Sequence, residues 1–142
     1  MYERILLSID LSDESSWQAP LEKALTLCKT FNSSLHIVNV IPDINFDVMQ
    51  LYLPDDTENN LIKSASKALS AFIKDSIPNE IGAVACVGEG SIYSAILKTA
   101  EQVKSDLIII GSHRPTMGDF LLGPNAARVV RHAACSVLVV RN

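Results

Sequence analysis

The sequence predicts an α/β fold: a doubly wound, open, parallel five-stranded sheet with helices on both faces. Five short runs of consecutive apolar residues are typical of parallel strands that are buried on both sides. Between them lie four stretches whose apolar residues have helical spacing, so strand and helix alternate along the chain. A length of 142 residues suits one such unit, and we expect residues 1–142 to form a single domain.

The five predicted strands are short and rich in Ile, Leu and Val. They cover residues 5–9, 35–41, 84–87, 107–110 and 137–140. Right-handed crossovers with one reversal of winding predict the strand order 3-2-1-4-5. The reversal then falls between the first and fourth strands. Open α/β sheets bind ligands at that point, beyond the carboxyl ends of the strands.

The four predicted helices are marked by apolar residues three or four positions apart. These residues span 17–28, 61–77, 92–103 and 126–133. Residues of the types that cap helices precede the first three helices: Ser12 or Asp13, Asp56 or Thr57, and Ser91. The run 88–91 lacks the Lys-Ser/Thr of a nucleotide-binding P-loop, so we interpret it as a turn followed by a cap.

Composition and charge argue against several classes of protein. With a formal net charge of -4, the chain has no broad attraction for nucleic-acid phosphates or for an anionic membrane, and we expect neither partner. No apolar run is long enough to span a bilayer and residues 1–10 lack a signal-peptide pattern, which predicts a cytoplasmic protein. Cys28, Cys86 and Cys135 have no CxxC spacing and are expected to be reduced and mostly buried.

Two connections are unusually long. The connection from Gly111 to Asn125 joins the fourth strand to the last helix, and loops of such length are often functional. The connection from Pro42 to Asp55 mixes acids and prolines with bulky apolar residues. We interpret the second connection either as a lid or partner-binding segment, or as a plain surface loop.

Glycines lie at both ends of the connection after the fourth strand. Gly111 would let the backbone leave the strand sharply and let a ligand approach the main chain, and Gly123 would do the same before the last helix. The N-terminus of that helix, with free N–H groups and a positive dipole end, suits a phosphate. The alternative is that both glycines only turn corners. His113 is either a phosphate contact or acid–base group, or an exposed loop residue.

The C-terminal third carries the most specific pattern, RPxxxxxLLGxNAAxVVRHAxCSVLVVR. It resembles the signature of the universal stress protein family, in particular its F and G subgroup, and the likeness extends over essentially the whole chain. The resemblance implies an adenine nucleotide alpha hydrolase-like fold that binds ATP or another adenine nucleotide, with or without Mg²⁺, and that acts in stress response as a nucleotide-dependent regulatory dimer.

The family motif of ATP-binding members is G-x2-G, a spacer, and then G followed by Ser or Thr. Gly111 matches its first glycine and Gly123 its last, whereas Arg114 stands at the second and the spacer is one residue shorter. The resemblance implies that Asp10 and the end of the first strand, Ser8 and Ile9, border the ribose. It also implies that Val40 lies against the adenine.

Asp10 has two further interpretations, as part of a magnesium shell and as a plain helix cap, and Ser12 is interpreted as a cap. Pro124 occupies the place of the family Ser or Thr and has neither a hydroxyl nor an N–H. It fits the first position of a helix. We expect Asn125 and the Arg114 guanidinium to supply the phosphate contacts instead.

Two functions remain open at this point. Gly111, Arg114, Gly123 and Asn125 favour a nucleotide-binding stress protein, whereas Pro124 favours a dimeric interaction module of the same fold that binds no nucleotide. No general base with an orienting partner is visible, so we assign no catalytic residue and expect at most a slow ATPase.

The histidines are not at metal-ligand spacing, so no metal site is predicted. His36 lies on a predicted strand, where we expect a neighbour to satisfy its polar edge, and His132 lies near the end of the last helix, where a structural role is expected.

The last predicted strand, Val137, Leu138, Val139 and Val140, lies at an edge of the sheet. Its unpaired backbone groups and apolar side chains predict pairing with a second copy, and the resemblance implies the same homodimer. The sequence does not identify a protein partner.

Overall fold

The structure is a computed structural model, and it describes residues 1–42, 57–112 and 122–141. A five-stranded sheet forms its centre, with the order β3-β2-β1-β4-β5 and every neighbouring pair parallel. The strands are β1 (Arg4–Ile9), β2 (Ser34–Pro42), β3 (Val84–Gly90), β4 (Leu107–Gly111) and β5 (Ser136–Val140). The predicted fold class and strand order are confirmed.

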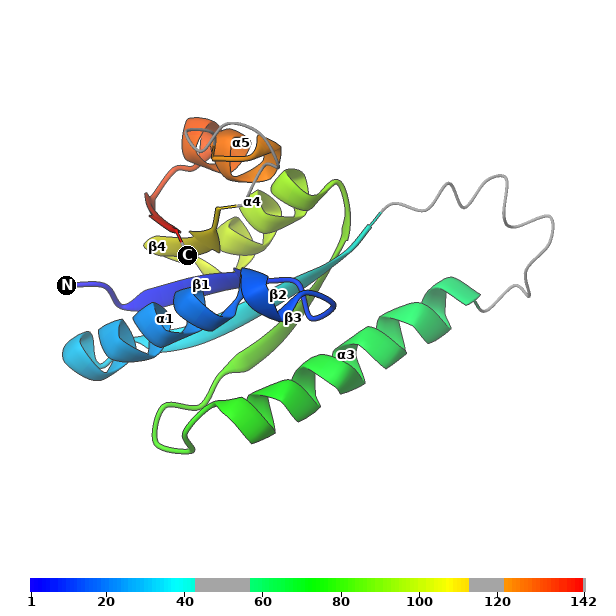
Figure 1. The fold of residues 1–142 in the computed structure, drawn as a ribbon, viewed down its shortest axis with the longest axis horizontal. Helices are drawn as coiled ribbons and strands as arrows, with labels where there is room; N and C mark the ends of the chain where they lie inside the picture. Colours follow the sequence, from blue (N-terminus) through cyan, green and yellow to red (C-terminus); the bar gives the residue numbers. More distant parts are fainter. Residues whose placement is uncertain (43–56, 113–121, 142) are drawn as a thin grey trace.

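Four α-helices and one short 3-10 helix connect the strands. They are η1 (Glu14–Ser16), α1 (Gln18–Phe31), α3 (Thr57–Ser76), α4 (Ile92–Val103) and α5 (Pro124–His132). Figure 1 shows α1 and α3 on one side of the sheet and α4 and α5 on the other, as a doubly wound sheet requires.

The sheet separates two hydrophobic cores because successive side chains of a strand point to opposite faces. Along β1, Ile5, Leu7 and Ile9 are buried against α1 and α3, whereas Leu6 is buried against α4 and α5. No side chain of Ile5, Leu6 or Leu7 is exposed at all. Each core therefore stabilises a different pair of helices through the same strands.

An aromatic pair joins the segment before α1 to α3. The rings of Trp17 and Phe72 lie edge to face, with centroids 4.8 Å apart and an interplanar angle of 77°. Such pairs add about 0.5–1.5 kcal/mol beyond the area they bury. The pair fixes the start of α1 against the C-terminal part of α3.

A carboxylate joins the amino ends of β1 and β4. Asp106 precedes β4, and its two carboxylate oxygens accept hydrogen bonds from the backbone N–H groups of Glu3 (2.8 Å) and Arg4 (3.0 Å). The N–H of Asp106 in turn donates to the carbonyl oxygen of Arg4 (2.9 Å). These bonds lie at the edge of the sheet opposite to the one where the strands end.

Three local predictions needed correction. Asp13 caps η1 rather than α1, since its side chain accepts a hydrogen bond from the Ser15 N–H. Gly88 and Gly90 belong to β3, which pairs with β2 as far as Pro42, so the predicted turn is strand. Ser91 occupies the N-cap of α4 as predicted, although its side chain makes no capping hydrogen bond.

The third correction concerns His36, for which a polar partner was expected. Its Nδ1 is buried and has no hydrogen-bond partner among the described residues. The reason is its place in the middle of the sheet, where Leu6 of β1 and Val84 of β3 are its neighbours in register.

In the described part of the chain, no helix combines the length and the hydropathy needed to cross a membrane. The connection from Pro42 to Asp55, predicted as a lid or a surface loop, lies outside the described residues after Pro42 itself.

Candidate functional site

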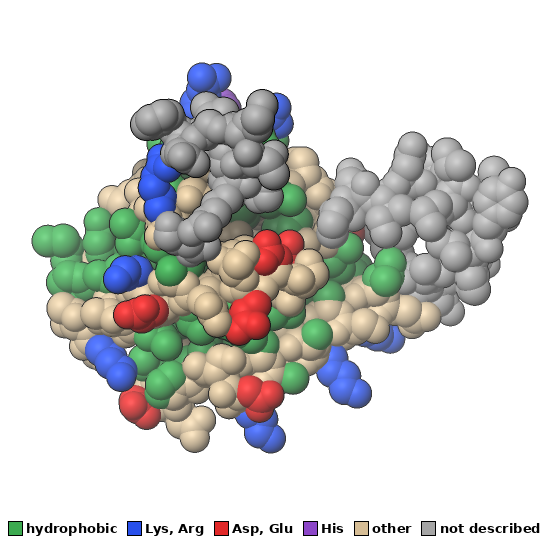
Figure 2. All heavy atoms as spheres, in the orientation of Figure 1, with side chains coloured by type: hydrophobic (Ala, Val, Ile, Leu, Met, Phe, Trp, Pro, Cys, Tyr) green, Lys and Arg blue, Asp and Glu red, His purple; other side chains and the backbone are tan. Residues whose placement is uncertain are grey.

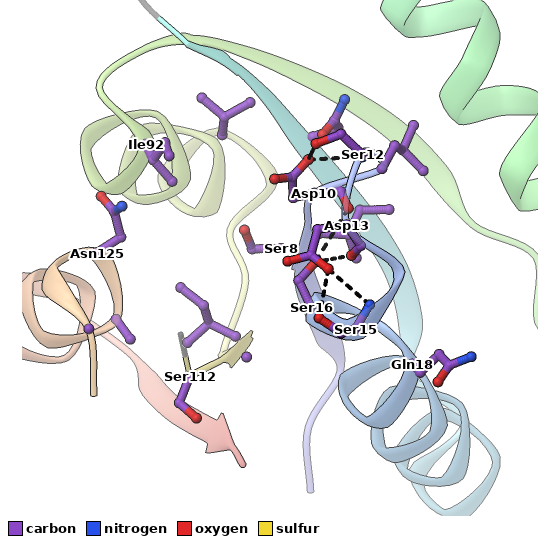
Figure 3. Close-up of a pocket in the computed structure, with 18 of the residues that line it drawn as sticks. Ser8, Asp10, Ser12, Asp13, Ser15, Ser16, Gln18, Ile92, Ser112 and Asn125 are labelled. Atoms are coloured by element: carbon purple, nitrogen blue, oxygen red, sulfur yellow. Dashed lines mark hydrogen bonds between the residues drawn. The ribbon is translucent and has the colours of Figure 1, made fainter. Parts of the chain in front are cut away.

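A cleft of about 1470 Å³ opens at the carboxyl ends of β1, β2 and β4, where the winding of the sheet reverses. The segment after β1 forms one side, and the first turns of α4 and α5 form the other (Figure 3). The predicted nucleotide-binding residues that line it are Ser8, Ile9, Asp10, Val40, Gly111, Gly123, Pro124 and Asn125. The other two, His113 and Arg114, lie outside the described residues.

The Asp10 carboxylate is held by the chain that follows it. Its Oδ1 accepts hydrogen bonds from the N–H (3.0 Å) and the Oγ (2.6 Å) of Ser12. Asp10 therefore orders the turn after β1 and does not cap α1, and Ser12 is a partner of Asp10 rather than a cap. Within the described residues the second oxygen, Oδ2, has no partner, so it remains available as an acceptor for a ligand hydroxyl.

The same arrangement repeats three residues later. Oδ1 of Asp13 accepts from the N–H (3.1 Å) and the Oγ (2.6 Å) of Ser15, and the Ser16 hydroxyl donates to the Asp13 carbonyl oxygen (2.6 Å). This chain of short local bonds is marked by dashed lines in Figure 3. It gives the rim of the cleft around the short helix η1 a defined shape.

β2 extends further than its neighbour β1. The last pair between them is Ile9 with Asn39, yet β2 continues to Pro42, paired on its other side with β3. The backbone groups of Val40 and Ile41 on the β1 side therefore have no strand partner among the described residues. Free N–H and C=O groups at a fixed spacing are suited to the polar edge of a planar ring.

Gly111 is explained by close packing rather than by a turn. A Cβ on this residue would lie 2.6 Å from the carbonyl oxygen of Ser16, closer than real Cβ contacts allow. The backbone does not leave the sheet here, since the N–H of Ser112 still donates to the Val140 carbonyl oxygen (2.9 Å). The missing side chain lets the end of β4 contact η1, and the course of the chain after Ser112 lies outside the described residues.

Gly123 and Pro124 form the start of α5. Gly123 is the N-cap with φ 85° and ψ 156°, a conformation that favours glycine, and Pro124 is the first helical residue, as predicted. The first backbone bond of the helix runs from the Ala127 N–H to the Gly123 carbonyl oxygen (3.0 Å). The N–H groups of Asn125 and Ala126 precede this bond, and both residues line the cleft.

Sequence reasoning missed several lining residues. Ile92 was expected only as part of the apolar face of its helix. It is 38% exposed and lines the cleft from the first turn of α4. Gln18 and Glu22 line it from α1, and no sequence signal pointed to them. Ser112 was the one that could have been found, because it directly follows Gly111.

The described lining residues carry negative charge only. Asp10, Asp13 and Glu22 are present, without any Lys, Arg, His or Cys. Figure 2 shows acidic side chains near η1, whereas α5 bears Arg128, Arg131 and His132. No group of three or more His, Cys, Asp or Glu among the described residues is placed to hold a metal ion. The visible groups suit binding and orientation of a ligand better than proton transfer.

The chain is similar to known proteins over nearly its whole length. The model of the universal stress protein family matches residues 1–141. Universal stress protein G of Shigella flexneri is 27% identical over 143 aligned residues, which cover 99% of this chain and 100% of that protein.

Two solved structures are similar in fold. A universal stress protein in complex with cAMP has a TM-score of 0.70 at 20% identity, covering 98% of this chain and 97% of that one. The universal stress protein of Archaeoglobus fulgidus in complex with dAMP has a TM-score of 0.57 at 17% identity, covering 97% of each chain.

Proposed function

This chain belongs to the universal stress protein family, and we propose that its cleft binds an adenine nucleotide, ATP or a close relative, which regulates a homodimer. The observation that carries the proposal is the cleft itself. Residues chosen from the sequence on three separate strands and one helix line a single opening at the switch point of the sheet. We propose at most slow hydrolysis, because the described lining offers no acid–base pair.

The parts of a nucleotide match different parts of the cleft. The unpaired backbone of Val40 and Ile41 suits the polar edge of adenine, and Oδ2 of Asp10 suits a ribose hydroxyl. The free N–H groups at the start of α5 suit a phosphate. The cAMP and dAMP held by the two proteins of similar fold support the choice of an adenine nucleotide.

The charge of the described lining is less suited to a triphosphate. The described lining has three carboxylates and no cation, and Pro124 lacks the N–H and hydroxyl that would meet a phosphate. Arg114 and an accompanying Mg²⁺ are the proposed sources of compensating charge. The same observation favours the second candidate, an interaction module that has the fold and the dimer but no nucleotide.

Thermal unfolding with added nucleotides tests the proposal. ATP with Mg²⁺ is expected to raise the melting temperature more than GTP does, because the adenine edge meets fixed backbone groups. A ligand that binds only the folded state adds about 2.7 kcal/mol at a hundredfold excess over its dissociation constant. No shift at millimolar ATP, together with no copurified nucleotide in a native mass spectrum, would establish the interaction module instead.

Two substitutions test how the phosphates are held. Arg114→Ala should weaken ATP binding strongly and adenosine binding hardly at all, since adenosine lacks the charge-assisted contact. Pro124→Ser should tighten ATP binding by restoring an N–H and a hydroxyl at the start of α5. Isothermal titration with both ligands measures the difference, and equal losses for ATP and adenosine in Arg114→Ala would mean that Arg114 only holds its loop.

A further inference from the structure

Ser8 is the one polar residue between the ends of β1. The strand reads Arg-Ile-Leu-Leu-Ser-Ile, and Ile5, Leu6 and Leu7 before it are fully buried. Its neighbours in register, Val38 of β2 and Ile110 of β4, are 0% and 6% exposed. A hydroxyl at the centre of such a sheet costs stability unless something hydrogen-bonds it.

No group of the described protein fills that role. The Ser8 hydroxyl has no hydrogen-bond partner among the described residues, whereas Ser12, Ser15 and Ser16 all donate to neighbouring oxygens. Ser8 is half-buried rather than buried because it lines the cleft. In Figure 3 its side chain reaches from β1 into the open space on the side of Ile92 and Asn125.

Several apolar side chains line the cleft together with Ser8. Val40 lies two residues beyond Val38 on β2, so it shares the face of the sheet to which Ser8 points. Ile92 of α4 and Leu122 before α5 also line the cleft, as does the polar Asn125. A hydroxyl next to apolar side chains suits a heteroaromatic ring, whose faces are apolar and whose edge carries nitrogen acceptors.

We propose that the Ser8 hydroxyl donates a hydrogen bond to a ring nitrogen of the bound base and thereby selects a purine in one orientation. The inference rests on the proposed nucleotide function and specifies how the base is recognised. It also assigns Ser8 a role in ligand binding rather than in folding. Its removal should therefore weaken binding without destabilising the free protein.

The test compares the parent protein with Ser8→Ala, using AMP as the ligand in isothermal titration. Loss of one neutral hydrogen bond should weaken AMP binding about fivefold. The melting temperature of the ligand-free variant should equal or exceed that of the parent, since no protein hydrogen bond is lost. Ser70→Ala, which replaces an exposed serine of α3 outside the cleft, is the matched control and should change neither quantity.

Ligand analogues identify the atom that is contacted. The difference between parent and Ser8→Ala should persist for two of the 1-deaza, 3-deaza and 7-deaza analogues of AMP and vanish for the third, which lacks the bonded nitrogen. Equal AMP binding by parent and variant overturns the inference and leaves the proposed function standing. A difference that vanishes only with 2′-deoxy-AMP assigns the contact to the ribose and also overturns it. Failure of the parent to bind any adenine nucleotide overturns both.

Discussion

At the scale of the residue, His36 shows what the middle of the sheet does to an ionisable group. Burial lowers the pKa of His36 below its ordinary value of 6.5, and the nearby Arg4 charge lowers it further. The unfolded chain takes up a proton at this histidine as the pH falls below about 6.5, while the folded protein resists it. The contribution of His36 to the free energy of unfolding is therefore fully present above that pH. It declines as the pH falls below about 6.5, down to the pKa of the folded state.

Replacing His36 should remove this pH dependence. Urea midpoints measured at about pH 7.5 and about pH 5.5 should differ less for His36→Leu than for the parent, because leucine does not titrate in either state. The quantity to compare is the difference between the two urea midpoints of each protein, since the substitution also alters packing at both pH values. Parallel losses in the two proteins would show that other groups account for the acid sensitivity.

At the scale of the element, the beginnings of β1 and β4 are joined by a single side chain. Both oxygens of Asp106 accept backbone N–H groups at the start of β1, so the carboxylate extends the ladder between the two strands by one step. Bonds to a charged acceptor are stronger than neutral ones. This contact aligns the central strands at the end of the sheet remote from the cleft.

Asp106→Ala should lower the free energy of unfolding by about 1–3 kcal/mol, because two N–H groups lose a charged acceptor. Chemical denaturation measures the loss. Asp75→Ala provides the control, since this exposed aspartate of α3 should cost little when it is removed. A loss of similar size in both variants would indicate a general effect of net charge rather than the contact with β1.

Some features of the helices and strands could be predicted from the sequence, and others could not. The alternation of strands and helices follows from apolar runs and helical spacing, both of which are local properties of the sequence. The extension of β3 to Gly90 and the reach of β2 beyond β1 depend on pairing between strands that are distant in the sequence. The cleft could be located in advance because topology alone places it at the switch point.

Residue roles within the cleft were harder to predict than its position. Gly111 was correctly placed there. The atom that leaves no room for a side chain at Gly111 is the carbonyl oxygen of Ser16, which belongs to another segment. Ile92 has the spacing of a core residue and yet lines the cleft, because helical periodicity does not tell where the end of a helix lies relative to the sheet.

At the scale of the whole molecule, the edge strand β5 is the proposed dimer interface. Within the described chain β5 pairs with β4 only, so its other side has no strand partner. Leu138 is 36% exposed and belongs to neither hydrophobic core, whereas Val137 and Val139 pack against the core beneath α5. An apolar edge of this kind invites pairing with a second copy.

Leu138→Lys should therefore yield monomers in light scattering at micromolar concentration with little change in stability. Val139→Pro should also prevent dimerisation, at a greater cost to the fold because it removes a backbone N–H from the strand. Val130→Lys on α5, where the side chain is 45% exposed, is the control and should leave the dimer intact. A persistent dimer in Leu138→Lys would place the interface elsewhere, and the connection from Pro42 to Asp55 would be tested next.

The edge-to-face pair of Trp17 and Phe72 makes the protein its own optical probe. Trp17 is the single tryptophan of the chain, and its ring contacts the α3 side of the molecule, while Ser16 and Gln18 beside it line the cleft. Its fluorescence therefore reports on the layer formed by α1 and α3, whereas circular dichroism reports on all helices. The two unfolding curves superimpose if both layers melt as one cooperative unit, and they separate if the layer of α4 and α5 melts alone.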